Sequence, residues 1–184
     1  MSLDAPFAPY RNLILSGYDG VGKNMLIRRI AEQSGAPCFD LETEIQLREN
    51  ASLDELRQTY GEARTRNLLK TLCGEFALRR GAVIAMPAAP LLDEDNRTRL
   101  LESSWLLVLT CQLNEVLRRL HAQHGARFHD PKVRAALLHQ VRQERKIYQL
   151  GALAVLDTTN LSVEQTAAQA LAFWRERELA RLNL

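Results

Sequence analysis

The chain has 184 residues, of which 46% are hydrophobic and 25% are charged, and its formal net charge at pH 7 is +2. This composition is typical of one soluble globular domain with a sizeable core, and it excludes a largely disordered chain. The small net charge favours neither nucleic acid nor an anionic membrane surface as the main partner. No apolar run is long enough to span a bilayer, and the amino terminus lacks a signal-peptide pattern.

The cysteines indicate a reducing environment. Cys38, Cys73 and Cys111 are odd in number, lie far apart and stand in apolar or helical surroundings. We therefore expect reduced core thiols in a cytoplasmic protein, with no metal-binding spacing among them.

The most informative stretch follows the first apolar run, residues 13–15. Glycines at positions 17, 20 and 22 precede Lys23, and a helical pattern over residues 24–34 begins at once. Glycine suits a loop whose backbone N–H groups curl round a phosphate, and Lys23 adds a positive charge for the β- and γ-phosphates. The alternative is a glycine-rich turn with a surface lysine. The order of strand, loop and helix favours a phosphate-binding loop.

The loop departs from the usual pattern at one position. The sequence G-x-x-x-x-G-K-[ST] is met at Gly17, Gly22 and Lys23, but Asn24 replaces the hydroxyl residue that usually binds Mg²⁺. An amide oxygen can also coordinate Mg²⁺, although Asn is bulkier than Ser.

A second strand is predicted at residues 38–40, and acids follow it. Asp40 and Glu42 lie at the carboxyl end of this strand, where ligands bind in open α/β sheets. They are candidates for holding metal-bound water and for accepting a proton from a substrate hydroxyl. The alternative is that both acids complement the dipole of a helix over residues 43–50.

The middle of the chain predicts further helices and a buried strand. Ser52 begins a helical segment with a capping box, and a long helix runs from Gly61 to about residue 80 with Arg64 and Arg66 in its first turns. An arginine there is either solvated or held to bind an anion. A third strand at 82–86 ends abruptly at the prolines of the segment 87–90.

The remaining elements alternate in the same way. Helices are predicted at 93–103, 114–121, 132–150 and 163–181, the last capped by Ser162, and strands at 105–110 and 152–156. The segment 121–131 is polar, carries three histidines and resembles a mobile lid; a metal site lacks the expected ligand spacing. Five strands alternating with helices predict a single α/β domain over residues 1–184, a three-layer sandwich around a five-stranded parallel sheet.

Several segments together resemble the shikimate kinases. They are GYDGVGKN at the phosphate loop, DLE after the second strand, YGEARTR, RRLHAQHGAR at the lid, ERKIY, and LDTTN after the fifth strand. The resemblance implies a P-loop fold of the nucleoside-monophosphate-kinase type, with ATP and Mg²⁺ as cofactors. It also implies a cytoplasmic monomer that phosphorylates a hydroxyl of shikimate or a related small hydroxylated carboxylic acid, with no nucleic-acid or membrane partner.

The same resemblance implies roles for individual residues. The implied catalytic residues are Lys23, Asp40, Glu42 and Arg127. The implied cofactor-binding residues are Gly17, Asp19, Gly20, Val21, Gly22, Lys23, Asn24, Met25, Arg119, Thr159 and Asn160. The implied substrate-binding residues are Glu42, Arg66, Ala88, Ala89 and Arg145, and the implied metal ligands are Asn24 and Asp40.

The departures from the family pattern gather in the substrate pocket. Glu42 replaces the family's second aspartate, and Pro87-Ala88-Ala89 replaces three glycines. Arg57 and Thr65 stand where aromatic rings are usual, and Leu69 replaces a glutamate. Two hypotheses remain. Either the chain is a kinase for shikimate or another hydroxy acid, or it has lost catalysis and binds nucleotide or metabolite in a regulatory or interaction role.

Overall fold

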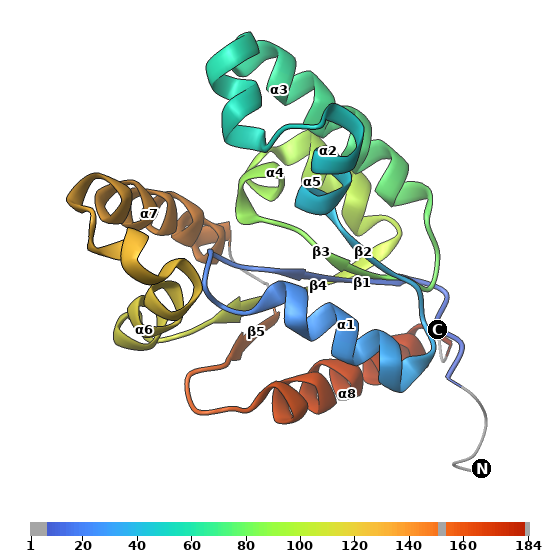
Figure 1. The fold of residues 1–184 in the computed structure, drawn as a ribbon. Coiled ribbons are helices and arrows are strands. Elements are labelled where there is room, and N and C mark those ends of the chain that lie inside the picture. The colour runs from blue at the N-terminus through green and yellow to red at the C-terminus, as the bar shows by residue number, and fades with distance from the viewer. Residues whose placement is uncertain (1–6, 151–153, 183–184) are drawn as a thin grey trace.

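The computed structural model describes residues 7–150 and 154–182, apart from the side chains of Gln123, His124 and Arg127. Within this part, five parallel strands form one sheet in the order β2-β3-β1-β4-β5 (Figure 1). The strands are β1 (Asn12–Ser16), β2 (Cys38–Asp40), β3 (Val83–Ala85), β4 (Ser104–Thr110) and β5 (Ala154–Asp157). Because all strands are parallel, their carboxyl ends meet at one edge of the sheet, where ligands bind in such folds.

Helices cover both faces of the sheet, and α6 and α7 stand beside its carboxyl edge (Figure 1). The helices are α1 (Lys23–Ser34), α2 (Leu41–Glu49), α3 (Leu53–Leu78), α4 (Ala88–Leu92), α5 (Glu94–Leu101), α6 (Leu113–His124), α7 (Pro131–Glu144) and α8 (Val163–Leu182), with 3₁₀ turns η1 (Gly125–His129) and η2 (Arg145–Leu150). None of the helices in the described part is long and apolar enough to cross a membrane.

Strand β1 explains the three layers. Leu13 and Leu15 point into a core formed with α1 and α8, whereas Ile14 points into a second core formed with α2 to α5. All three side chains are fully buried because successive residues of a strand face opposite sides of a sheet that is covered on both sides. The predicted three-layer α/β sandwich with a five-stranded parallel sheet is therefore confirmed.

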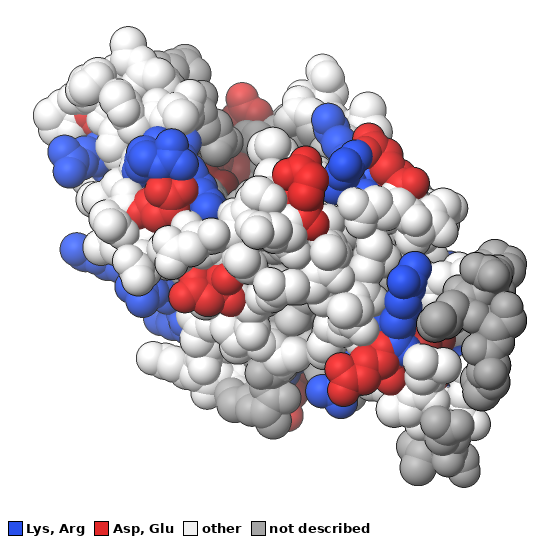
Figure 2. Space-filling view, turned by 90° about the horizontal axis from the view of Figure 1, so that it is seen from below, with Lys and Arg blue, Asp and Glu red and all other residues white. Residues whose placement is uncertain are grey.

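Charges of both signs are interspersed on the face formed by α1 and α8 (Figure 2). On the described part of this face, Arg29 of α1 pairs with Glu32 at 3.0 Å and lies 4.0 Å from Glu164 of α8. Such mixed charge creates no single-sign field of the kind that attracts nucleic acid.

Several predicted boundaries were wrong. The two helical segments predicted from Ser52 and Gly61 are both present, because α3 consists of two helices that meet at a kink at Gly61, where φ is 80° and ψ is 171°. The capping box of Ser52 and Glu55 is present as predicted. The third strand ends at Ala85, and the predicted break at Pro87 is the amino-terminal cap of the short helix α4. A helix tolerates proline there because the proline lacks only an N–H that would have no partner.

The carboxyl-terminal half shows further differences. Helix α6 continues to His124, so the segment 121–131 contains a helix end and the turn η1, and Phe128 of that turn is buried in the core. In the segment predicted as one helix over 132–150, the α-helix α7 ends at Glu144. The residues that follow form the 3₁₀ turn η2. The start of the predicted fifth strand, Ala152 and Leu153, lies outside the described residues.

The cysteines are free, as predicted, but they are not all core thiols. Cys73 and Cys111 are buried, and burial raises the pKa of Cys73 to about 12. Cys38 is exposed, because β2 is the edge strand of the sheet.

Candidate active site

The loop between β1 and α1 has the backbone geometry that its glycines suggest. Gly17 has a φ of 139°, and a Cβ at this position would lie 2.4 Å from the carbonyl oxygen of Leu109. Gly22, the cap of α1, has a φ of 92° with no neighbouring atom within 4 Å of the added Cβ. At position 17 a side chain would clash with the Leu109 carbonyl and the positive φ also favours glycine. At position 22 only the positive φ favours glycine.

Lys23 is buried under the loop rather than extended into solvent. Its Nζ donates hydrogen bonds to the carbonyl oxygens of Gly17, at 2.9 Å, and Tyr18, at 3.2 Å. These bonds satisfy the buried ammonium group and fix the curvature of the loop. Lys23 thus stands at the amino terminus of α1, where backbone N–H groups face an incoming anion.

Two side chains connect the loop to other segments of the chain by hydrogen bonds. The hydroxyl of Tyr18 accepts a hydrogen bond from the backbone N–H of Cys111 at 2.8 Å and donates to the carbonyl of the same residue. The buried carboxylate of Glu144 accepts the N–H of Asp19 at 2.7 Å. Both contacts join the loop to distant parts of the chain and make its conformation a property of the fold.

A cavity of about 600 Å³ adjoins the loop. It contains six of the predicted cofactor-binding residues: Val21, Gly22, Met25, Arg119, Thr159 and Asn160. Glu115 and Thr158, to which the sequence assigned no role, also line it. The size of the cavity suits the base and ribose of a nucleotide.

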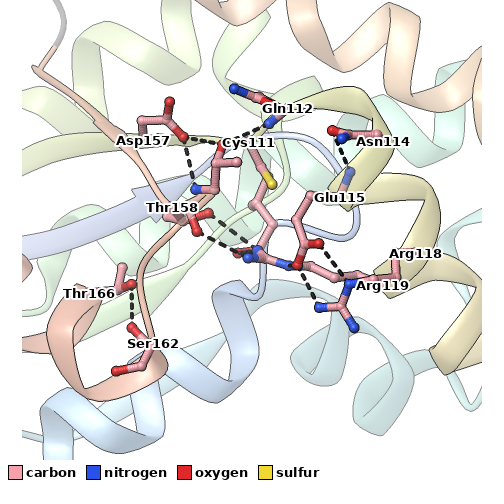
Figure 3. Close-up of polar contacts among 12 residues, drawn as sticks. Cys111, Gln112, Asn114, Glu115, Arg118, Arg119, Asp157, Thr158, Ser162 and Thr166 are labelled. Carbon is pink, nitrogen blue, oxygen red and sulfur yellow. Dashed lines mark hydrogen bonds and ion pairs between the residues drawn. The ribbon is translucent and has the colours of Figure 1, made fainter.

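Arg119, which lines this cavity, is held in place by the polar contacts that Figure 3 shows. Its Nε donates to Glu115 at 2.8 Å, and its other nitrogens reach Oγ1 of Thr158 at 3.3 Å and the carbonyl of Thr158 at 3.0 Å. A further contact runs to the carbonyl of Val21 at 3.4 Å. Hydrogen bonds from Arg118 and Arg119 lower the pKa of Glu115 to about 2, so this carboxylate stays charged at neutral pH. The spacing of Glu115, Arg118 and Arg119 on a helix could have indicated these pairs.

The acids after β2 have different environments. Asp40 caps α2 by accepting the N–H of Thr43 at 2.7 Å. This contact agrees with the alternative that the acid stabilises the amino terminus of the following helix. Glu42, in the first turn of α2, remains accessible to solvent. Partial desolvation nevertheless raises its pKa to about 6, with Lys23 opposing the rise and Asp40 adding to it.

The predicted substrate residues are distributed over several elements. Arg66 of α3 and Arg145 of η2 are both exposed, and the guanidinium of Arg145 lies 6.0 Å from the centre of the Tyr18 ring. Ala88 is fully buried, whereas Ala89 is half-buried, so of these two alanines Ala89 is the one a ligand can reach.

Other charged residues near these positions have protein partners. Arg64, which the sequence placed with Arg66 in the first turns of the helix from Gly61, stacks on Tyr60 at 4.0 Å and lies 3.9 Å from Glu49.

The backbone of Arg127 belongs to η1, but its side chain lies outside the described part. In the lid segment, the Nε2 atoms of His121 and His129 lie 3.2 Å apart. The described residues contain no group of three or more metal-ligating side chains.

The strand order, the loop after β1 and the adjoining cavity define a P-loop kinase fold of the nucleoside-monophosphate-kinase type. The family profile for shikimate kinase matches residues 19–175, and the chain belongs to this family. The shikimate kinase of Geobacter sulfurreducens is 28% identical over 172 residues, which cover 91% of this chain and 93% of the relative. That of Zymomonas mobilis is 28% identical over 144 residues, which cover 76% of this chain and 82% of the relative.

Solved structures agree on the fold. Shikimate kinase from Acinetobacter baumannii, in complex with shikimate, matches with a TM-score of 0.78 at 20% identity, covering 94% of this chain and 97% of the other. A gluconokinase from Sinorhizobium meliloti matches with a TM-score of 0.62 at 19% identity, covering 95% and 97%.

Proposed function

We propose that the protein is an ATP-dependent phosphotransferase that phosphorylates a hydroxyl of shikimate or of a related small hydroxylated carboxylic acid. The observation that carries this proposal is the continuity of the phosphate loop with the cavity beside Arg119, which share Val21 and Gly22. Membership of the shikimate kinase family supports the same activity.

The chain's own residues account for nucleotide binding. The loop N–H groups and Lys23 bind the phosphate oxygens, and Arg119 provides a flat guanidinium against which a base stacks. Arg127, carried on the lid segment, reaches the phosphates when the lid closes. Phosphoryl transfer requires mainly positioning and neutralisation of charge, which these groups supply.

The residues at the loop also suit Mg²⁺. Asn24 is exposed in the first turn of α1 and offers an amide oxygen. Asp40 uses one carboxylate oxygen to cap α2, which leaves the other for a water molecule of a hydrated ion. Bound there, the ion would neutralise charge on the phosphate oxygens.

The acid substrate is assigned to three residues that do not line the cavity beside Arg119. Arg66 and Arg145 bind its carboxylate, because a guanidinium pairs with a carboxylate through two parallel hydrogen bonds. Glu42 accepts the proton of the hydroxyl that is phosphorylated. The exposed position of all three side chains leaves them free to meet a ligand.

The test is an ADP-release assay with Mg-ATP and a panel of hydroxylated carboxylic acids that includes shikimate and gluconate. We expect at least one acid to be phosphorylated, and the Lys23→Ala variant to lose both turnover and ATP binding. A Lys23→Ala protein that bound ATP as well as the parent would overturn the loop assignment.

The same assay decides between the two hypotheses that the sequence left open. Binding of ATP without turnover of any acid in the panel would favour a non-catalytic role in regulation or interaction. The burial of Ala88, where the family pattern has glycine, is the observation that favours this second hypothesis.

A further inference from the structure

The junction between α7 and η2 is attached to the phosphate loop. Glu144, the last residue of α7, accepts the backbone N–H of Asp19 at 2.7 Å. Tyr148 of η2 packs edge-on against Tyr18 of the loop, with ring centres 5.9 Å apart. The two contacts lie on either side of Arg145, so the loop fixes the backbone that carries this arginine.

The rest of η2 is equally constrained. Ile147 is fully buried in the core on the α3 side of the sheet, and the hydroxyl of Tyr148 donates to the carbonyl of Leu109. Arg145 itself is exposed, with its guanidinium 6.0 Å from the centre of the Tyr18 ring. Contacts on both sides of Arg145 limit the freedom of its backbone, so a ligand has mainly the freedom of the exposed side chain to restrict when it binds.

The burial of Glu144 calls for a functional explanation. The residue is 5% exposed, and besides Asp19 its one described hydrogen-bond partner is Gln140, whose Nε2 donates at 3.3 Å. Lys23 lies close enough to lower the pKa of Glu144, but burial outweighs it and the pKa is raised. A buried carboxylate without a direct ion pair costs free energy, so stability alone does not account for an acid at this position.

We propose that Glu144 is a positioning residue that couples the phosphate loop to Arg145, so that a nucleotide and a carboxylic acid strengthen each other's binding. The proposal rests on the function proposed above. A nucleotide that orders the loop also orders the Asp19 N–H, Glu144 and the start of η2. By linkage, a carboxylate held at Arg145 orders the loop to the same extent.

The test measures the affinity for ADP with and without shikimate, or with the acid that the kinase panel selects, in the parent and in Glu144→Ala, Glu144→Gln and Gln143→Ala. In the parent we expect the acid to tighten ADP binding about fivefold or more, a typical coupling between sites. Glu144→Ala should lose this factor while its affinity for ADP alone changes less than about threefold. Glu144→Gln should retain part of it, because its amide oxygen can still accept the Asp19 N–H. Gln143→Ala, on the exposed side of α7, should behave like the parent.

The kinetic signature separates positioning from a general structural defect. For Glu144→Ala we expect a higher KM for the acid with little change in the KM for ATP. An equal loss in both, or full coupling in Glu144→Ala, would overturn the proposal.

Hydrogen exchange tests the link without any ligand and therefore independently of the proposed function. Glu144→Ala should speed amide exchange in residues 17–23 and 145–150 together, and Gln143→Ala in neither. If no acid binds but this joint change is seen, the proposed substrate is wrong and the mechanical link stands. If Glu144→Ala speeds exchange in only one of the two segments, or in neither, the link itself is refuted.

Discussion

Arg119 donates hydrogen bonds to both oxygens of Thr158, to the carbonyl at 3.0 Å and to Oγ1 at 3.3 Å. Thr158 is buried immediately after β5, where its own N–H and hydroxyl bond to the carbonyl of Thr110 at the end of β4. The sheet edge thus fixes the plane of the Arg119 guanidinium (Figure 3). A side chain fixed in this way can stack on a base with little loss of freedom.

Replacing Arg119 by alanine should therefore weaken ATP binding. The lost stacking and cation–π interaction is worth about 1 to 2 kcal/mol, which corresponds to roughly a 5- to 30-fold higher Kd. Calorimetric titration with ATP measures the change. Arg142→Ala is the control, because Arg142 is an exposed arginine of α7 that does not line the cavity. Equal losses in the two variants would show that Arg119 has no special contact with the nucleotide.

The phosphate loop could be predicted because its signal is local. Glycine spacing, one lysine and the change from strand to helix pattern all fall within residues 13–34. The sequence did not specify the order of the strands in the sheet. Buried apolar runs such as 105–110 nevertheless identified the central strands, because both faces of these strands are buried and their side chains alternate between the two cores. The edge strand β2 is less buried, and this is why Cys38, placed in the core by prediction, is exposed.

The contacts that hold the site could not be predicted, because they join residues far apart in the chain. Glu144 and Asp19 are 125 positions apart, and Arg119 and Thr158 are 39 apart. The polarity of the segment 121–131 suggested a mobile lid and did not indicate that Phe128 is buried in the core. One aromatic residue in a polar segment has no periodicity, so its burial appears only in the folded chain.

Asn24 and Glu42 give a prediction about activity. Asn24→Ser would supply the shorter hydroxyl ligand, and Glu42→Asp would move the carboxylate back by about 1 Å, a displacement that can change rates by up to about 100-fold. We expect the double variant to raise kcat/KM for shikimate by about tenfold or more in the ADP-release assay. Adding Lys23→Ala to the double variant should abolish the gain. A decrease in kcat/KM would mean that the pocket is adapted to the residues it has.

Glu178 gives a prediction about stability. Its buried carboxylate accepts the indole N–H of Trp105 at 2.8 Å and the backbone N–H of Tyr10 at 2.7 Å. Glu178→Ala leaves both donors without this partner and should lower the free energy of unfolding by about 3 kcal/mol. Urea denaturation followed by tryptophan fluorescence measures it. Glu176→Ala, on the exposed side of α8, should stay within about 0.5 kcal/mol of the parent. A loss below about 1 kcal/mol in Glu178→Ala would show that water replaces the carboxylate.

Glu144 gives a prediction about pH that is separate from coupling. Burial raises the pKa of Glu144 above its ordinary 4.5, while Lys23 and the N–H of Asp19 oppose the rise and the Asp19 carboxylate adds to it. Because the folded state holds this proton more tightly than the unfolded state, the contribution of Glu144 to stability falls as pH rises from about 4.5 through the raised folded-state pKa. The charged carboxylate therefore destabilises the fold at neutral pH.

Glu144→Gln removes this titration and keeps an acceptor for the Asp19 N–H. We expect the stability of the variant relative to the parent to increase as pH rises above 4.5, measured as the difference in free energy of unfolding in urea at each pH. Groups whose surroundings the substitution leaves unchanged contribute equally to both proteins and cancel in this difference. A difference that does not change with pH would mean that water reaches the Glu144 carboxylate and that its charge carries no cost.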